Sequence, residues 1–504
     1  MSRPLPPKPV RWPIWILAII AGAASAETCD ELNSLSLGHT EIVSASSIAA
    51  GSFEAPGRGG RFGSQAYAAL PAFCRVEAIS RPAAGSDIGI EVWLPTTNWN
   101  GKLQAVGNGG WAGSISHSAM AGAVAAGYAA TSTDTGHQGG TPNFSAERDK
   151  LIDFAYRAVH EMAVTAKAVT ESFYERPHTQ AYFAGCSTGG RQALTAAQRY
   201  PDDFDGIVSG APAYYPSHIQ GTQVWIAQVS NRSDAARIGE TEFRLVNDRA
   251  IAACDTIDRV EDGVIENPSE CRFDPAVLAC PADGGNACLA PEQVETVRMI
   301  YQGPAASNGT NLFPGLVRGS ELGWATLSGA EPLSLARETY ELLVYDDSDW
   351  HWQDFDADSD FATAVERIGP LMDSNDADIS AFVERGGKLI LNHGWNDPGI
   401  PPGGTIRYYE AVQATLGATD SDQSVRLFMV PGMNHCGGGT GTDQFDAVAA
   451  LDRWRVTGQA PERIEAERRV NGETVRTRPL CAYPEVAVYD GSGSTDETSN
   501  FSCR

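Results

Sequence analysis

Several features that would indicate other classes of protein are scarce or missing in this sequence. Positive charge is scarce: 37 Lys and Arg residues stand against 63 Asp and Glu, which gives a formal net charge of −26. Such an acidic chain should repel nucleic acid and anionic membranes, so we expect neither as a partner. None of the ten cysteines forms a CxxC pair, which argues against a zinc site. We see no internal repeat, and no segment after residue 26 is apolar enough to cross a bilayer.

The length and overall composition are those of a folded protein larger than one simple domain. The chain has 504 residues, of which 42% are hydrophobic and 20% are charged. This length predicts either two domains or one core with a large insertion.

The first 26 residues have the pattern of an export signal. Basic residues precede a short apolar run over residues 12–23, and Ala24-Ser25-Ala26 fits a cleavage site. An uncleaved membrane anchor is the alternative, but the run is short for a span of about 20 residues. We therefore expect residues 1–26 to be a signal peptide, the mature chain to begin near Glu27, and the protein to be secreted or periplasmic.

Strand-like and helix-like segments alternate through most of the chain, which predicts an α/β fold with a mostly parallel sheet. This alternation lapses over residues 213–380, which carry four cysteines and several tryptophans. We interpret 213–380 as an inserted lid domain, 27–212 and 381–504 as the catalytic domain, and 27–87 as a mixed leader. The expected strands are 88–94, 102–106, 128–131, 181–184, 388–391 and 425–430, and the expected helices are 147–173 and 191–199.

A G-x-S-x-G motif stands between an expected strand and an expected helix. It reads Gly185-Cys186-Ser187-Thr188-Gly189. In that context the sharp turn lifts the serine hydroxyl clear of the sheet, at the positive end of the helix. The motif alone is common and also fits an ordinary tight turn, but its position between strand and helix favours Ser187 as a nucleophile.

A serine nucleophile needs a base, and two residues late in the chain fit the base and its acid partner. His435 lies in a glycine-rich loop after the last expected strand, and Asp397 follows the strand before it. The chain order serine, acid, histidine is that of α/β-hydrolases. His393 is a rival base, but it precedes the acid and is interpreted as structural. Asn396, beside the acid, is expected to border the substrate pocket.

Two loops that precede Ser187 are assigned supporting roles. The backbone N–H of Thr188 should be one donor to the oxyanion of the reaction, and a second should come from the loop at residues 107–110. We favour Gly110, although a plain glycine turn is the alternative. Asp134 and His137 resemble catalytic residues, but their place before the serine favours bracing of a loop.

An even number of cysteines after an export signal predicts disulfides rather than a thiol enzyme. A bridge between Cys186 and Cys436 would bring their Cα atoms to about 5–6 Å and hold Ser187 beside His435. Each cysteine could pair elsewhere, but joining Cys29 to Cys74 leaves Cys186–Cys436 as the simplest completion. Short spacing favours the other three pairs, Cys254–Cys271, Cys280–Cys288 and Cys481–Cys503.

An acidic loop inside the expected lid has the chemistry of a calcium site. Closely spaced carboxylates around a glycine turn supply the oxygen ligands that this cation prefers, although the spacing is not that of an EF-hand. A solvated acidic turn is the alternative interpretation. The expected ligands are Asp255, Asp258, Asp262 and the carbonyl oxygens of Val260 and Val264.

Taken together, these motifs resemble the tannase/feruloyl esterase family, which also includes mono(2-hydroxyethyl) terephthalate hydrolase. The resemblance spans residues 27–504, and the Cys-Ser and His-Cys pairs are its most specific mark. It implies a triad of Ser187, Asp397 and His435, a Cys186–Cys436 disulfide, and structural calcium in the lid. The matching segments are 107–110, 133–137, 185–190, 255–265, 393–397, 434–437 and 478–484.

The resemblance also implies the substrate class. The expected partner is a small ester of an aromatic acid, of the hydroxycinnamic or gallic type and in some cases derived from plant polymers. A terephthalate monoester hydrolase, a lipase, a peptidase and an inactive binding homologue are the alternatives. An aromatic acyl group needs a flat apolar slot, for which the lid offers Trp324, Trp350 and Trp352.

Overall fold

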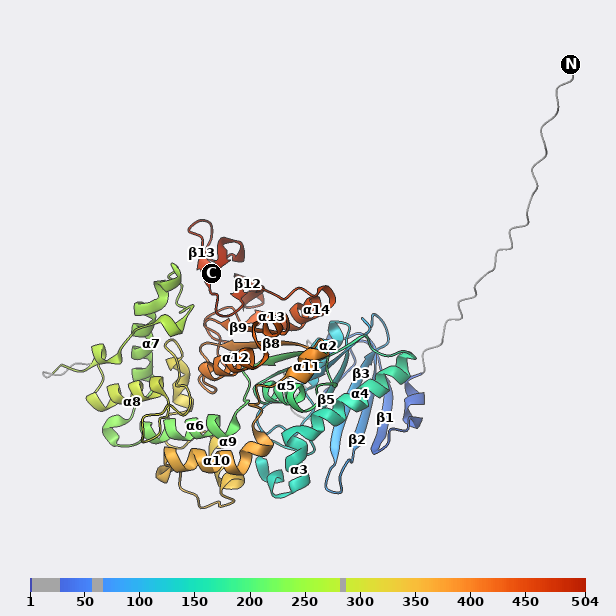
Figure 1. Cartoon of the computed structure of the whole chain (residues 1–504), viewed down its shortest axis with the longest axis horizontal. Coiled ribbons are helices and arrows are strands. Elements are labelled where there is room, and N and C mark those ends of the chain that lie inside the picture. Colours follow the sequence, from blue (N-terminus) through green and yellow to red (C-terminus); the bar gives the residue numbers. More distant parts are fainter. Residues whose placement is uncertain (2–27, 57–66, 282–286) are drawn as a thin grey trace.

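The computed structural model describes residue 1 and residues 28–56, 67–281 and 287–504 (Figure 1). Apart from Met1, the predicted signal peptide therefore lies outside the described residues. Within those residues, no helix has both the length and the apolar character needed to cross a membrane.

A nine-stranded sheet in the order β1-β2-β3-β5-β4-β6-β7-β8-β9 forms the centre of the molecule. From β5 to β9 in this order every neighbouring pair is parallel, whereas β1, β2 and β3 add to one side in antiparallel fashion. The predicted mostly parallel α/β fold is therefore confirmed. The strand bounds are Thr40–Ile48, Phe73–Ser80, Ile88–Pro95, Lys102–Val106, Ala129–Thr133, Gln180–Cys186, Gly206–Gly210, Lys388–Gly394 and Val425–Val430 for β1 to β9.

Helices cover both faces of this sheet because its central strands are apolar on both sides. Consecutive residues show the two faces: Leu389 of β8 belongs to one core cluster and Ile390 to another. Helices α4 (Ala158–Tyr174), α5 (Thr188–Arg199) and α12 (Pro402–Leu416) pack on the first face, and α2 (His117–Ala125) and α14 (Ala447–Thr457) pack on the second.

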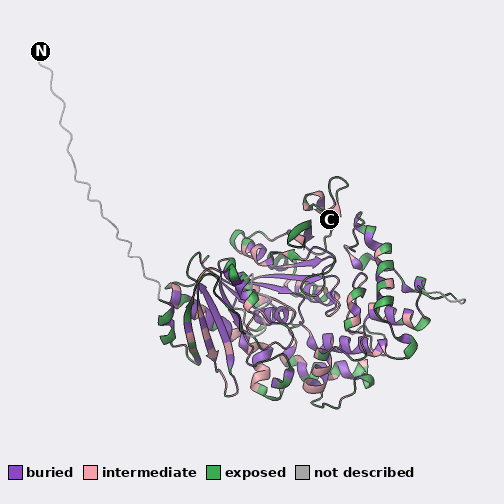
Figure 2. Cartoon of the chain, turned by 180° about the vertical axis from the view of Figure 1, so that it is seen from behind, coloured by how far each residue is buried: buried purple, intermediate pink, exposed green. Residues whose placement is uncertain are grey.

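Residues 213–380, here called the helical segment, contain helices but no strand in their described part. Figure 1 shows α6 to α10 gathered on the side of the molecule away from β1 to β3. The segment packs around a core that contains Phe243, Trp324 and Phe361 and that also includes Trp111 and Phe154 from outside the segment, and Figure 2 shows buried residues on many of its helices. Its α-helices are α6 (Pro216–Ser230), α7 (Glu240–Cys254), α8 (Pro291–Gln302), α9 (Ser334–Glu338) and α10 (Ala357–Met372), and α11 (Ser380–Glu384) follows at its C-terminal end.

Two parts of the fold differ from the sequence prediction. Residues 27–87 are not a separate leader, because they supply the sheet strands β1 and β2 and are tied together by the Cys29–Cys74 disulfide. The chain also ends in a small sheet of β10 (Gln444–Phe445), β11 (Arg463–Val470) and β12 (Glu473–Cys481), followed by a pair, β13 (Ala487–Tyr489) and β14 (Phe501–Cys503).

Candidate active site

The predicted triad residues all follow strands of the parallel part of the sheet. Ser187 comes directly after β6, Asp397 soon after β8, and His435 in the loop after β9. Because neighbouring parallel strands point the same way, the loops after them emerge at one edge of the sheet. Segments more than 200 residues apart in the chain, counted from Ser187 to Asp397, therefore meet at that edge.

Ser187 lies in a strained turn. Its φ of 63° and ψ of −121° fall in a region that residues with a side chain rarely adopt. The turn is held by two hydrogen bonds: the Ser187 N–H donates to the Gly210 carbonyl, and the Ser187 carbonyl accepts from the Ala213 N–H, both at 3.0 Å. Gly185 is required, since a Cβ there would lie 2.6 Å from the carbonyl carbon of Gly189.

Asp397 and His435 form a direct pair. The His435 Nδ1–H donates to Asp397 Oδ2 at 2.6 Å, and the Asp397 side chain is fully buried. Burial alone would raise the pKa of Asp397, but hydrogen bonds from His393 and His435 lower it well below its usual range. For His435, burial lowers the pKa, whereas the hydrogen bond to Asp397 and its negative charge raise it, and the net direction is upward. The imidazole is therefore oriented, with Nε2 left for a proton transfer.

A disulfide joins the residue before Ser187 to the residue after His435. Cys186 and Cys436 are bonded with their Cα atoms 6.0 Å apart, across a sequence separation of 250. The other four predicted pairs are also the disulfides of the structure, so all five predicted pairings are confirmed. The Cys186–Cys436 bond keeps the serine turn and the histidine loop side by side.

The loop after β4 is clamped to the start of α5. The Thr188 hydroxyl donates to the Gly110 carbonyl at 3.0 Å, and the Gly189 N–H donates to the Asn108 carbonyl at 2.8 Å. Gln192 and Asn108 form two hydrogen bonds: the Asn108 backbone N–H donates to Gln192 Oε1, and Gln192 Nε2 donates to Asn108 Oδ1. Thr188 and Gly110, the predicted oxyanion donors, thus lie on two segments in direct contact, and their role stays a prediction.

Asp134 and His137 bind backbone groups of neighbouring loops. Asp134 Oδ1 accepts the N–H groups of Gly89 and Gly136, and burial raises its pKa to about 7. His137 Nε2–H donates to the Trp111 carbonyl at 2.8 Å. These contacts fit the bracing role predicted for the two side chains.

The helical segment holds the loop that carries Asp397. Asn396 donates to the Gly319 carbonyl at 2.7 Å rather than simply lining a pocket. On the other side of Asp397, Gln223 of α6 donates to the Gly399 carbonyl at 2.7 Å. Sequence reasoning missed both contacts, because nothing in the local pattern connects residues so far apart.

The comparisons with known proteins agree with this arrangement. The sequence profile of the tannase and feruloyl esterase family matches residues 74–504. The chain belongs to this family. An uncharacterized esterase of Xanthomonas campestris pv. campestris is 36% identical, over 96% of this chain and 92% of its own length. A probable feruloyl esterase B-2 of Aspergillus flavus is 34% identical over 79% of this chain and 80% of its own.

Solved structures show the same fold over nearly the whole chain. A feruloyl esterase B from Aspergillus oryzae has a TM-score of 0.86 and 28% identity, covering 94% of this chain and 99% of that one. A tannin acyl hydrolase from Aspergillus niger, with a TM-score of 0.76 and 23% identity over 92% and 90% of the two chains, shares the fold. This member of the tannase and feruloyl esterase family is therefore a carboxylic ester hydrolase with an α/β-hydrolase fold.

Three tryptophans were predicted to offer a flat apolar slot for the aromatic acyl group. They lie in the core that includes the helical segment or pack against it. Trp324 is fully buried, and its Nε1–H donates to Ser320 Oγ. Trp352 is also in this core, and Trp350 stacks on Tyr340. The three indole rings are therefore packed against other residues of the helical segment.

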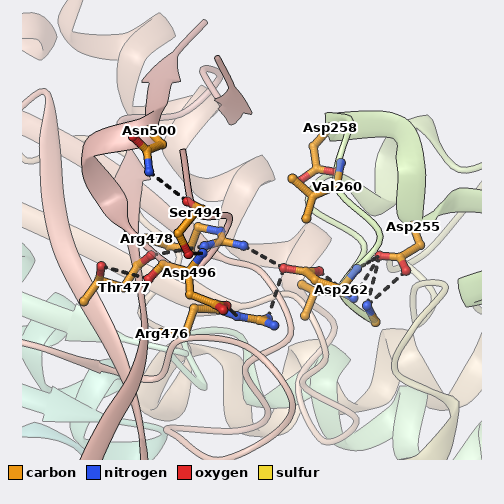
Figure 3. A network of polar contacts seen from close by, with 12 residues as sticks. Asp255, Asp258, Val260, Asp262, Arg476, Thr477, Arg478, Ser494, Asp496 and Asn500 are labelled. Atoms are coloured by element: carbon orange, nitrogen blue, oxygen red, sulfur yellow. Dashed lines mark hydrogen bonds and ion pairs between the residues drawn. The ribbon is translucent and has the colours of Figure 1, made fainter. Parts of the chain in front are cut away.

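The predicted calcium loop is drawn in Figure 3. Asp255 accepts backbone N–H groups, among them that of Gly263 at 3.0 Å, and Asp262 Oδ2 accepts from Arg476 at 3.0 Å and Arg478 at 2.8 Å. Asp258 is buried with one backbone donor, from Val260, and burial raises its pKa to about 6. In the described part of the chain, no three side chains of His, Cys, Asp or Glu converge as metal ligands. The buried, unneutralised Asp258 fits a cation, and calcium stays a prediction.

Proposed function

We propose that this chain is a secreted serine carboxylesterase that hydrolyses esters of aromatic acids, of the hydroxycinnamic or gallic type, through an acyl-enzyme. The observation that carries the proposal is the His435–Asp397 pair tied to the Ser187 turn by the Cys186–Cys436 disulfide. A hydroxyl, an imidazole and a buried carboxylate in this chain order are the parts of a nucleophilic triad.

The reaction follows from the positions of these groups. His435 Nε2 takes the proton of the Ser187 hydroxyl as the oxygen attacks the ester carbonyl, and Asp397 stabilises the imidazolium. The N–H groups of Thr188 and Gly110 stabilise the oxyanion. His435 then protonates the departing alcohol, and water activated by the same imidazole releases the acid.

The aromatic acyl group is supported by the relatives and by one contact at the site. Relatives of this chain include probable feruloyl esterases and a tannin acyl hydrolase. Leu335 of α9 supplies an apolar surface beside the oxyanion loop, since a Cβ built on Gly110 would lie 3.6 Å from its Cδ1. The helical segment thus contributes a wall next to the reacting carbonyl.

Secretion is supported by the disulfides. Five disulfides in one chain indicate an oxidising compartment, because cytosolic thiols are kept reduced. The export signal predicted over residues 1–26 agrees with this inference.

Structural calcium in the helical segment is part of the proposal. Asp255, Asp258, Asp262 and the carbonyls of Val260 and Val264 would hold the ion, which would neutralise the buried Asp258 carboxylate and stiffen the loop. The loop is already closed by the Cys254–Cys271 disulfide. The ion takes no part in the proposed chemistry.

A panel of substrates tests the proposal. Methyl ferulate, methyl gallate, mono(2-hydroxyethyl) terephthalate, methyl butyrate and an aminoacyl anilide are assayed side by side with wild type and Ser187→Ala. We expect the highest kcat/KM on ferulate or gallate, no anilide cleavage, and at least about 10³-fold loss in Ser187→Ala. Wild-type turnover in that variant would remove the mechanism, and preference for the butyrate ester or the anilide would remove the substrate class.

A further inference from the structure

His393 is a polar side chain at the site that the proposed reaction does not use. It stands near the end of β8 with no exposed surface, and both ring nitrogens have partners. Nε2 lies 3.0 Å from Asp397 Oδ2 and 3.1 Å from the Ile400 carbonyl, and Nδ1 lies 2.7 Å from Thr405 Oγ1. A histidine that only filled space would not need three such contacts.

These contacts determine where the ring proton is. Both neighbours of Nε2 are acceptors only, so Nε2 must carry a hydrogen. The Thr405 hydroxyl, which bonds to Nδ1, has no other hydrogen-bond partner among the described residues. This hydrogen bond holds the ring with Nε2 directed at Asp397 Oδ2.

The carboxylate of Asp397 is consequently surrounded by four donors. Oδ1 accepts the N–H groups of Gly399 at 2.8 Å and Ile400 at 2.9 Å. Oδ2 accepts from two imidazoles, His435 at 2.6 Å and His393 at 3.0 Å. Two backbone donors hold one oxygen in place, and the second oxygen is shared between the rings.

We propose that His393 is a positioning residue that sets the basicity of His435 by sharing Asp397 Oδ2, and that Thr405 holds the His393 ring in the orientation this requires. A hydrogen bond to a carboxylate spreads part of its negative charge. With His393 in place, Asp397 orients His435 without holding its proton too tightly. The proposal rests on the triad mechanism proposed above.

Few other charged groups lie near Asp397 and His435 that could change the basicity of His435. Asp397 is the titratable group that acts on His435, and the two imidazoles are the titratable groups that act most strongly on Asp397. From α12 the facing side chain is Thr405, and from α6 it is Gln223, both uncharged. A change in the pH dependence after substitution of His393 can therefore be assigned to the shared carboxylate.

The pH dependence of kcat/KM tests the inference with two substitutions of His393. His393→Leu removes the donor, so Asp397 should hold the His435 proton more tightly and the acid limb should move up by roughly 0.5–1 pH unit. His393→Gln keeps an N–H near the Nε2 position and should leave the limb within about 0.2 unit of wild type. If both variants lose activity while the limb stays at its wild-type pH, His393 is a packing residue and the inference is wrong.

Thr405 keeps the test decisive if His393→Leu does not fold. Thr405→Val removes the hydrogen bond to Nδ1 while nearly conserving volume, so the His393 ring should be held less well against Asp397 and the limb should move in the same direction by a smaller amount. Thr405→Ser retains the hydroxyl and should restore the wild-type profile. Identical profiles for Val and Ser would overturn the inference. Ser187→Ala in the same assay separates the two proposals, because its retained turnover would remove the triad mechanism itself.

Discussion

Asp397 is a buried residue that stays ionised because hydrogen-bond donors replace the water it loses. An isolated carboxylate in such a place would take up a proton, since burial penalises the charged form. Here the pKa of Asp397 is lowered, and its charge in turn raises the pKa of His435. The electrostatics of the site thus follow from a few hydrogen bonds around one side chain.

Replacement of this carboxylate by an amide should abolish most activity. Asp397→Asn keeps the size of the side chain but loses the charge that orients His435, and kcat should fall by about 10⁴-fold. Asp134→Asn is the matched control, because Asp134 binds only backbone N–H groups, and kcat should change by less than about tenfold. Steady-state kinetics on methyl ferulate make the comparison. Similar losses in both variants would contradict the assignment of Asp397 as the acid.

The raised pKa of His435 predicts the position of the acid limb in wild type. The imidazole must be neutral to take the serine proton, so kcat/KM should fall as the pH is lowered through its pKa. Because that pKa is raised, the limb should lie above the ordinary imidazole value of about 6.5. A pH profile of kcat/KM measures it, and a limb well below pH 6 would contradict the Asp397–His435 pair.

The positions of Ser187, Asp397 and His435 after strands of the sheet could be predicted from the sequence, whereas the contacts around them could not. Ser187 has a motif, and Asp397 and His435 follow strands in the right chain order. The contact of His393 with Asp397 depends on the tight turn between them, where the Asp397 N–H donates to Gly394, and on packing against α12. Neither leaves a local sequence pattern.

Elements with a strong hydrophobic period were predicted nearly to their ends, and irregular elements were not. The strand Val425–Val430 agrees with its prediction, because a short apolar run ends in proline and glycine. β1 was missed, since its strand is largely exposed and broken by a bulge between Ile42 and Ser44. The expected helix at 147–173 contains a π turn over Asp153–Arg157.

That π turn is connected to the helix of the nucleophile. The fully buried guanidinium of Arg191 on α5 donates to the carbonyls of Phe154 at 3.1 Å and Ala155 at 2.8 Å. Burial lowers the pKa of Arg191 to about 10. The Arg191 contact exists because the π turn directs the carbonyls of Phe154 and Ala155 toward α5. Residue spacing in the sequence does not show this orientation.

Removal of the disulfide between the serine turn and the histidine loop should weaken catalysis even where the protein stays folded. In Cys186→Ala/Cys436→Ala the two elements lose their covalent link, and a displacement of about 1 Å can cost 10²-fold in rate. The matched control is Cys280→Ala/Cys288→Ala, which opens a local bridge in the helical segment. Both are assayed well below their Tm. Equal kcat values for the two double variants would show that the link does not position the site.

At the scale of the whole molecule, the sheet and the helical segment both contribute residues around the candidate active site. Ser187, Asp397 and His435 follow strands of the sheet. Gln223 and Gly319 of the helical segment form hydrogen bonds with the loop that carries Asp397. The insertion was predicted from the lapse in the α/β alternation, but its hydrogen bonds to the loop that carries Asp397 could be seen only in the structure. The stability of the helical segment should therefore affect catalysis.

Calcium should stabilise the protein if the acidic loop of the helical segment binds it. A ligand that binds only the folded state at 100 times its Kd adds about 2.7 kcal/mol, so Tm should rise by several degrees between EDTA and millimolar calcium. Asp258→Asn should abolish this response, and Asp234→Asn, at an exposed acid outside the loop, should retain it. Thermal melts check this. A wild-type Tm that is the same in EDTA and calcium would contradict the calcium site.

Covalent labelling of the native enzyme tests most directly that the chain folds to place an activated serine beside His435. Diethyl 4-nitrophenyl phosphate is added, released nitrophenol is counted, and the unreduced digest is mapped by mass spectrometry. We predict one equivalent released, loss of esterase activity, and the phosphoryl group on Ser187 in a peptide linked through Cys186 to Cys436. A label on another residue, or activity that survives stoichiometric labelling, would contradict the account.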